Sequence, residues 1–495
     1  MKKVSLSIQL VRRRALQGRW AEVKIHALAT FVVACSLLLE QPRLTLVSGG
    51  MICFFVYIYI GLREARKSSL WLTPLSFYFF WYSIGLGISP LYLGLTLKQD
   101  DLVRFASDQT MVPLTDLANA YVLYLAGSLA LHVGMQIFRP KLSPKSSPIS
   151  GHNLLGWLAV VWIAGLLFQF SPQSFSFLGA AVKIFSIAVV GSVCGFAVTP
   201  PEKMGITRPV FAMLLIIGTA GVFFGNLASG SKAYIMFSFL PVVWLCITKP
   251  RLRVWIPALV VVLATFYLFI VAPVIYTARE KPLQEGEDPR QHIVESFDTW
   301  LKERPEVLSG SFFEEQVDQF LNRQFDVVPV GFIMGEVNSS GLLMGDSLKY
   351  AAYAFVPRVL WPGKPNVTRG AWFSTYLGLF ETEAEATTSI GMTATGELYW
   401  NYGMPGVFLG MLAIGSLIGL LWRMASADPR GRPMHMLLYV STMLSMTDMP
   451  EAVTVFVSIA VTFITFKAAF IVFDMVVRRG IKSGGIVLEL NRARP

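Results

Sequence analysis

Long apolar runs recur along almost the whole of this 495-residue sequence, and they restrict what the chain can fold into. A run of about 18 or more apolar residues makes a helix that crosses roughly 30 Å of hydrocarbon. Only 15% of the residues are charged, whereas soluble domains carry about a quarter. The pattern excludes a soluble multidomain protein and predicts an all-α polytopic membrane protein. About twelve transmembrane helices are expected, at 23–39, 44–62, 70–96, 117–138, 153–170, 178–199, 209–227, 234–248, 254–276, 404–422, 434–447 and 452–473.

Lys and Arg residues are concentrated in alternate connecting segments, which predicts the orientation of the chain. Cytoplasmic loops of membrane proteins carry an excess of these residues. With the N-terminus inside, inner segments such as 1–24, 139–152 and 474–495 are all net positive. Segment 277–403 then faces outward, and it holds 18 acidic and 10 basic residues, a net charge of −8. The sequence predicts a multi-pass protein of the bacterial inner (cytoplasmic) membrane with both termini cytoplasmic.

The same charge pattern indicates which kinds of partner the protein can have. The positive charge is spread over the inner membrane face, which favours membrane lipids and excludes nucleic acid as a partner. Three regions are expected: a bundle of about nine spans at 1–276, a large periplasmic loop at 277–403, and about three spans with a cytoplasmic tail at 404–495. Within the loop, apolar residues fall on one helical face at 292–301 and 312–325. These two amphipathic helices would lie on the membrane surface or cap the bundle.

A short outward turn, ASGSKAY (228–234), is the first candidate site, with Lys232 at its tip. Gly and Ser allow backbone N–H groups to converge on an anion, and the Lys adds a point charge. The alternative is an ordinary loop with a solvated Lys. Arg279, directly after the ninth predicted span, and Arg323, on the second amphipathic segment, are further outward cations.

The second candidate is FVPRVLWPGKP (355–365), in which Arg358 and Lys364 precede a third cation, Arg369. Its prolines stiffen the backbone, and Trp361 would sit against a sugar ring or in the membrane interface. Stiffly held cations beside aromatic rings suit a ligand that combines phosphate with sugar. The alternative is an interfacial anchor whose cations meet lipid headgroups.

The third candidate is GELYWNYGMPG (396–406), where Glu397 is expected at the mouth of a span among aromatic residues. A carboxylate there could act as the general base for a sugar hydroxyl; the alternative is a solvated Glu in an aromatic belt. His292 is the one histidine expected outside. The acidic run ETEAE (381–385) could bind a divalent cation but is interpreted as a solvated loop, and no pair of the four cysteines has metal-ligand spacing, so neither a metal nor a cofactor is expected.

The order of these three segments resembles that in the bacterial oligosaccharide repeat-unit polymerases, the O-antigen polymerase (Wzy-type) family. Members carry a Gly-Ser-Arg turn, a Pro-Arg-x-x-Trp-Pro-x-Lys-Pro segment and a Gly-Glu-x-Tyr-x-Asn-x-Gly stretch. The corresponding residues here are SGSKA (229–233), PRVLWPGKP (357–365) and GELYWNYG (396–403). The sequence departs from the family at Lys232, where Arg is usual.

The resemblance implies a metal-independent glycosyltransferase that polymerises oligosaccharide units at the periplasmic membrane face. Its donor would be a growing glycan on undecaprenyl diphosphate, and its acceptor the next lipid-linked unit. A flippase and a chain-length regulator of the same pathway are possible partners. Outward cations would stabilise the leaving diphosphate. The implied catalytic residues are Glu397 and Arg358, and the implied diphosphate- or sugar-binding residues are Lys232, Arg279, Arg323, Lys364, Arg369 and Trp361.

Other functions remain open on the sequence. An O-antigen ligase or another lipid-linked glycosyltransferase would share this architecture. A lipid-linked oligosaccharide flippase or other transporter would have short loops and ionisable residues near the bilayer midplane, and a non-catalytic export scaffold is a further alternative.

Overall fold

The computed structural model describes residues 20–471 with internal gaps. The gaps of four or more residues are 98–101, 141–155, 166–179, 228–231, 281–288, 303–313 and 365–368. Within the described residues, helices and one short hairpin account for almost all regular structure. The elements used below are α2 (Pro42–Ala65), α3 (Pro74–Ser83), the π-helix η2 (Ile84–Ile88), α4 (Ser89–Thr96), β1 (Leu102–Phe105), β2 (Ser107–Pro113), α5 (Leu114–Phe138), α7 (Ala180–Val198), α8 (Pro201–Met204), α9 (Arg208–Leu227), α10 (Lys232–Phe237), α11 (Leu240–Thr248), α12 (Ile256–Phe266), the π-helix η5 (Tyr267–Val271), α13 (Ala272–Glu280), α14 (Pro289–Lys302), α17 (Val328–Ser340), α18 (Tyr350–Ala354), α19 (Gly370–Tyr376), α20 (Ala394–Ala425) and α21 (Pro433–Leu444).

Seven helical stretches in the described part of the chain are long and apolar enough to cross a membrane, which confirms a multi-pass, all-α membrane protein. They are Trp20–Leu39, Pro42–Ala65, Leu114–Phe138, Arg208–Asn226, Arg253–Ile275, Ala394–Ala425 and Ala452–Ala469. Three shorter apolar helices, Val189–Val198, Ile235–Thr248 and Met434–Leu444, coincide with further predicted spans. The predicted span 153–170 lies largely outside the described residues.

The predicted span 70–96 is a broken helix. Thr73 caps α3 reciprocally with Ser76, and Pro74 occupies the first helical turn, where its missing N–H has no cost. The π-helix η2 follows α3, and Pro90 stands in the first turn of α4. A proline removes one backbone donor from the helical ladder, and a π turn is a usual way to accommodate such a break.

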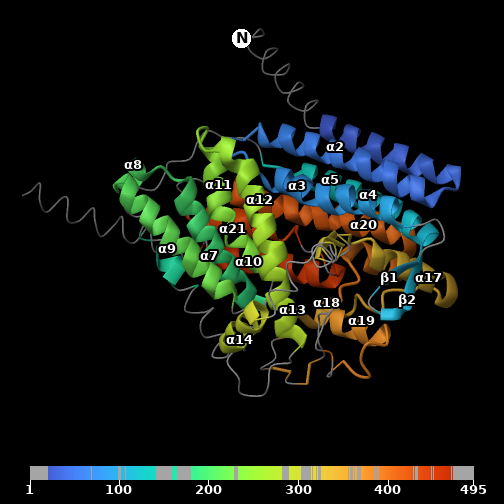
Figure 1. The fold of residues 1–495 in the computed structure, drawn as a ribbon. Coiled ribbons are helices and arrows are strands. Elements are labelled where there is room, and N and C mark those ends of the chain that lie inside the picture. Colours follow the sequence, from blue (N-terminus) through green and yellow to red (C-terminus); the bar gives the residue numbers. More distant parts are fainter. Residues whose placement is uncertain are drawn as a thin grey trace, which may run out of the picture.

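The centre of the bundle is the pair α5 and α20, which pack along much of their length (Figure 1). Gly134 on α5 faces the backbone of Leu412, and Gly415 on α20 faces the backbone of Leu131. A Cβ at either glycine would clash with the opposing main chain. Small residues at such positions let two membrane helices approach closely.

The short helix α8 and the hairpin of β1 and β2 lie at opposite ends of the bundle (Figure 1). The hairpin was not predicted, because four- and seven-residue strands give too short an alternating pattern to detect. Val103 and Phe105 on β1 are nevertheless buried in the main core. The hairpin lies beside α17, which packs against both strands and against α5.

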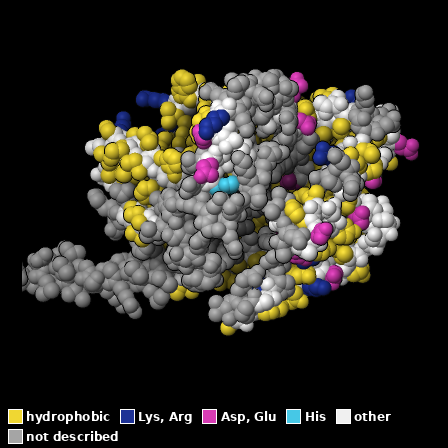
Figure 2. All heavy atoms as spheres, turned by 60° about the horizontal axis from the view of Figure 1, so that its bottom comes forward, with side chains coloured by type: hydrophobic (Ala, Val, Ile, Leu, Met, Phe, Trp, Pro, Cys, Tyr) yellow, Lys and Arg dark blue, Asp and Glu magenta, His cyan; other side chains and the backbone are white. Residues whose placement is uncertain are grey.

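The first predicted amphipathic helix is confirmed as α14. Its Trp300 packs in a second apolar cluster with Ile235, Val271 and Val274, so this helix caps the bundle rather than standing free. Of the second predicted segment, residues 316–318 are helical, and Phe320 makes an edge-on contact with Tyr267. On the face that carries α14, α18 and α19, acidic side chains are scattered among hydrophobic ones (Figure 2).

Candidate functional site

Helix α20 folds back on itself near its start. Tyr402 and Gly403 have non-helical backbone angles, with φ of 61° at Gly403, and Pro405 follows. In a straight helix, residues eight apart lie about 12 Å apart along the axis. Here the carbonyl oxygen of Leu398 would be only 2.5 Å from a Cβ on Gly406. Residues 394–401 therefore form a short arm packed against the beginning of the long arm, and the predicted span 404–422 begins at the turn between them.

Glu397 lies on the short arm and is completely buried. It was expected at the mouth of a span; instead the fold-back carries it into the bundle. The Ser347 hydroxyl donates a hydrogen bond of 2.6 Å to Oε1, and the backbone N–H of Val453 donates one of 3.0 Å to Oε2. The N–H of Ala452 is a further donor to this carboxylate. The solvated alternative for Glu397 is wrong, because its carboxylate caps the N-terminus of the helix Ala452–Ala469.

Asn401 completes the hydrogen bonding around this carboxylate. Its Nδ2 donates to the Ser347 hydroxyl (2.8 Å) and to the carbonyl of Glu397 (2.7 Å). Its Oδ1 accepts from the N–H of Gly345 (2.9 Å), and the N–H of Leu343 donates to the carbonyl of Trp400 (2.9 Å). Segment 343–347 is thus fixed to the short arm. The sequence reasoning missed Asn401, although its spacing of four from Glu397 places both on one helical face.

Arg369 lies close enough to this arrangement for its charge to act on Glu397, and its side chain is 6% exposed. Its guanidinium carbon lies 4.1 Å from the Tyr350 ring centroid and 4.4 Å from that of Trp372, so the cation lies over two aromatic rings. In the described part of the chain its Nε has no hydrogen-bond partner, and Nη1 is 3.9 Å from the half-exposed Glu383. The Arg369 charge also interacts with the Glu397 carboxylate. A guanidinium that packs on aromatic rings can present its planar N–H edge to a carboxylate or phosphate.

Aromatic side chains form a wall beside Arg369. Trp400 of the short arm contacts Trp372 and Tyr376 of α19, at ring-centroid distances of 5.8 and 5.1 Å. The Tyr376 hydroxyl donates a 2.6 Å hydrogen bond to Glu336 of α17. Partial burial, together with this hydrogen bond, raises the pKa of Tyr376 to about 12. These rings and hydroxyls are the groups with which proteins pack against sugars.

Two described residues of the PRVLWPGKP segment, Trp361 and Lys364, contact α18, the helix that carries Tyr350. Lys364 donates to the carbonyl oxygens of Ala354 (3.2 Å) and Val356 (2.9 Å). Trp361 is 38% exposed and meets Tyr353 edge-on at 5.4 Å. Lys364 therefore fixes the turn of this segment, while Trp361 remains available to a ligand.

The other predicted site residues are placed less completely. Arg358 and Arg323 lie outside the described residues. Lys232 is the first residue of α10 and Arg279 belongs to α13, but their side chains are not among those described. His292 of α14 donates from Nε2 to the carbonyl of Ala278 (2.7 Å), which ties α14 to α13.

A family model described as "Domain of unknown function (DUF8712)" matches residues 91–428. The match includes segment 343–347, α18, α19 and the short arm of α20, and it ends before the last span. No functionally curated protein and no solved structure matches the chain.

Proposed function

This chain belongs to the DUF8712 family, and because that description assigns no activity, we propose a function from the site: polymerisation of undecaprenyl-diphosphate-linked oligosaccharide units at the periplasmic membrane face. In this reaction the bond between the donor's anomeric carbon and its diphosphate breaks. The acceptor hydroxyl oxygen bonds to that carbon and loses its proton, and undecaprenyl diphosphate leaves.

The observation that carries the proposal is the environment of Arg369. A guanidinium that lies over the Tyr350 and Trp372 rings, with Glu383 no closer than 3.9 Å, is a cation held in place before any anion arrives. Preorganised charge of this kind stabilises developing negative charge without reorganisation at the moment of reaction. A diphosphate leaving group is such a charge, and the adjacent aromatic wall suits the attached sugar.

The remaining predicted cations have assigned places in the proposal. Arg358 belongs to the same segment as Lys364 and is seven residues after Ala351 of α18. We therefore assign it, together with Arg369, to the diphosphate. Lys232, Arg279 and Arg323 are assigned to the same ligand or to its second phosphate. Because the chain supplies these cations itself, the proposed transfer uses no metal or other cofactor.

Glu397 has two possible roles, and the geometry favours positioning over proton removal. Both of its oxygens already accept hydrogen bonds, from Ser347 and from the N-terminus of the last span. A general base must reach the acceptor hydroxyl within hydrogen-bond distance, which here requires the Ser347 bond to open. His292 is the next candidate for the base.

An O-antigen ligase or another lipid-linked glycosyltransferase would use the same anion site.

One observation favours a flippase: the ionisable residues Glu22, His26, Glu64 and His132 are fully buried in the bundle, as is typical of membrane transporters.

The species that accumulate in cells without this protein distinguish these functions. For a polymerase we expect single lipid-linked repeat units on the periplasmic side of the membrane. Long, undelivered lipid-linked chains would identify a ligase, and single units retained in the cytoplasmic leaflet would identify a flippase; either result contradicts the polymerase proposal.

A further inference from the structure

A column of polar side chains runs through the apolar interior between the first helix, α2, α3 and α5. His26, Tyr57, Ser128 and His132 are all fully buried. Ser128 and His132 lie one helical turn apart on α5, and Gln136 continues the same face. Polar groups are costly in a membrane interior unless they are hydrogen-bonded, so the contacts of this column decide what it does.

Every member of the column contacts the next. Gln136 Nε2 is 3.2 Å from His132 Nε2, and His132 Nδ1 is 3.3 Å from His26 Nδ1. His26 Nε2 is 3.0 Å from the Tyr57 hydroxyl, which in turn is 3.0 Å from the Ser128 hydroxyl. The two imidazole rings therefore join the first helix directly to α5.

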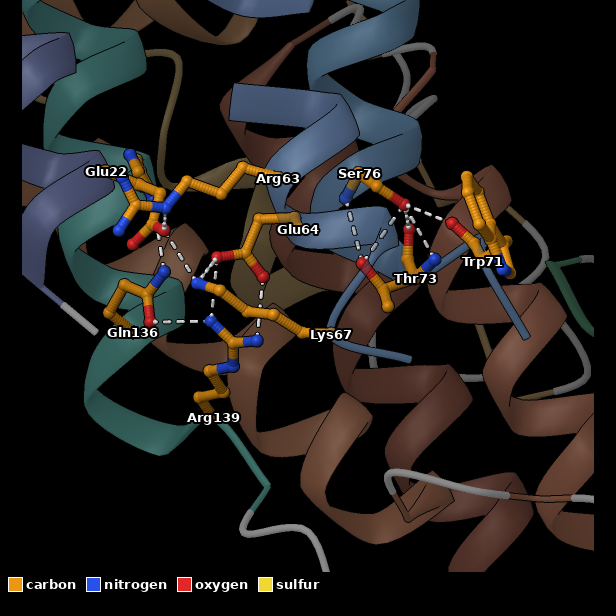
Figure 3. A network of polar contacts seen from close by, with 10 residues as sticks. Glu22, Arg63, Glu64, Lys67, Trp71, Thr73, Ser76, Gln136 and Arg139 are labelled. Carbon is orange, nitrogen blue, oxygen red and sulfur yellow. Dashed lines mark hydrogen bonds and ion pairs between the residues drawn. The ribbon is translucent and has the colours of Figure 1, made fainter. Parts of the chain in front are cut away.

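The column is anchored where α2 and α5 end. Arg139 donates to Gln136 Oε1 (3.4 Å) and to Glu64 (3.0 Å), and Lys67 bridges Glu64 and Glu22 at 2.7 Å each. Figure 3 shows this cluster, with Arg139 directed toward both Gln136 and Glu64. Because the Gln136 oxygen faces a permanent cation, its NH₂ group must face His132.

That orientation fixes the proton positions along the column. His132 Nε2 accepts from Gln136, so its proton is on Nδ1 and is donated to His26 Nδ1. His26 then carries its proton on Nε2 and donates it to Tyr57. Each of the four ring nitrogens has one partner of the correct kind, and both rings are neutral.

One additional proton cannot be accommodated in this arrangement. On His132 Nε2 it would face the Gln136 NH₂ group, and on His26 Nδ1 it would face the N–H of His132. An amide and a guanidinium do not relay protons, so the column ends at Gln136 and Arg139 and does not cross the bundle. An imidazolium can form only if one of these hydrogen bonds breaks.

We propose that the His26–His132 pair is a buried proton-binding site that takes up one proton in acid. Protonation then breaks one of two hydrogen bonds: the one between the two rings, which joins the first helix to α5, or the one between His132 and Gln136. The proton adds to a lone pair of one ring nitrogen, and no other bond changes. The charged and titratable groups around the pair are Glu22 on the first helix, Cys53, Tyr57, Arg63, Glu64 and Lys67 on or just beyond α2, Tyr78 and Tyr82 on α3, and Arg139 after α5.

The Gln136 side chain, whose orientation fixes the proton positions, provides the test. In Gln136→Glu, a carboxylate of almost the same shape accepts from both Arg139 and a protonated His132, so the missing acceptor is supplied. Gln136→Met is the matched control, because it removes the amide without adding an acceptor. The readout is the ¹⁵N spectrum of the full-length protein, labelled at histidine and reconstituted in lipid, at about pH 8 and then in steps down to about pH 3.

We expect neutral signals from His26 and His132 at the higher pH in the wild type and in Gln136→Met. We expect imidazolium signals in Gln136→Glu at the same pH, and an imidazolium in the wild type only toward the acid end of the series. Signals that stay neutral in Gln136→Glu, or in the wild type throughout acidification, overturn the proposal.

A second measurement does not depend on spectral assignment. The unfolded chain binds protons at both histidines, so acid destabilises a fold that keeps them neutral, and stability rises with pH. Between about pH 8 and pH 5 we expect the melting temperature of the wild type to fall by roughly 5 °C more than that of His26→Phe/His132→Phe. Equal falls in both proteins contradict the inference.

Discussion

Glu397 accepts a hydrogen bond of 3.0 Å from the backbone N–H of Val453, so the first turn of one helix caps the N-terminus of another that begins 55 residues later. The same carboxylate accepts the Ser347 hydroxyl at 2.6 Å. One side chain therefore joins the short arm of α20, the last span and segment 343–347. Since that segment leads directly into α18, it also positions Tyr350 against Arg369.

This relationship predicts the effect of Glu397→Gln. The neutral amide retains only one acceptor oxygen, while its NH₂ group must face Ser347 or the N–H of Val453. Hydrogen bonds to a charged group contribute about 1.5–3 kcal/mol each, so we expect the free energy of unfolding to fall by roughly 2 kcal/mol, together with glycan transfer. Calorimetry of the purified protein and an assay with lipid-linked substrate measure the two quantities.

The alternative role of Glu397 gives a different pair of results. If it is the general base, Glu397→Gln slows transfer strongly while thermal stability and substrate binding are retained. Ser347→Ala separates the roles further, because it removes one hydrogen bond to the carboxylate and leaves the carboxylate itself. A positioning role predicts a partial loss of both stability and transfer in Ser347→Ala.

Arg369 gives the sharpest test of the anion site. Loss of one preorganised contact to a developing charge costs about 10²–10³-fold in rate, and we expect a loss of that size for Arg369→Ala. Arg369→Lys should recover only part of it, because an ammonium lacks the planar surface that packs on aromatic rings and cannot bind an oxyanion in a bidentate manner.

Lys349→Ala is the matched control for Arg369, since Lys349 is an exposed cation of the same region and is paired with Asp346 at 2.6 Å. It should leave the rate unchanged. Near-normal transfer by Arg369→Ala, in protein that is folded and membrane-inserted, would remove Arg369 from the site.

The fold-back of α20 depends on glycine at the contact between its two arms. A Cβ at position 406 would meet the Leu398 carbonyl oxygen at 2.5 Å, and overpacking of this kind costs about 1–3 kcal/mol. We expect Gly406→Ala to lower the melting temperature and to reduce transfer, because the displaced short arm carries Glu397. Gly335→Ala on α17 is the control: its nearest neighbour would be 3.8 Å away, so stability should not fall.

The long spans and the start of a span at residue 404 were predictable from sequence, because apolar length and a Pro/Gly-rich break are local signals. The fold-back was not. Residues 394–401 are rich in aromatic and polar side chains, which is typical of a membrane interface, and most of them are buried through contacts with distant segments, among them α17, α19, segment 343–347 and the last span. The same limit applies to Asn401, whose partners Gly345 and Ser347 are more than fifty residues away.

Among the candidate cations, too, one part of the site was predictable from sequence and another was not. Their residue types predicted an anion site, but not which of them is stacked and which is used in packing. Arg369 is enclosed by Tyr350 from one helix and Trp372 from another, whereas Lys364 is occupied by backbone carbonyl oxygens. Periodicity within a single segment carries no information about such contacts between segments.

The proposed function requires the Arg369 site to face the periplasm, and thiol labelling tests this directly. In a background without the four native cysteines, a single Cys in place of the exposed Ser340, at the end of α17, should react with a membrane-impermeant reagent once the outer membrane is permeabilised. A Cys in place of Glu202, on α8 at the opposite end of the bundle, should react only after the inner membrane is lysed. The charge pattern predicts this difference, because the segment around Ser340 is acidic and the one around Glu202 is predicted to be cytoplasmic. Labelling in the reverse order would place Arg369 and its aromatic wall on the cytoplasmic side, where the periplasmic polymerase reaction could not take place.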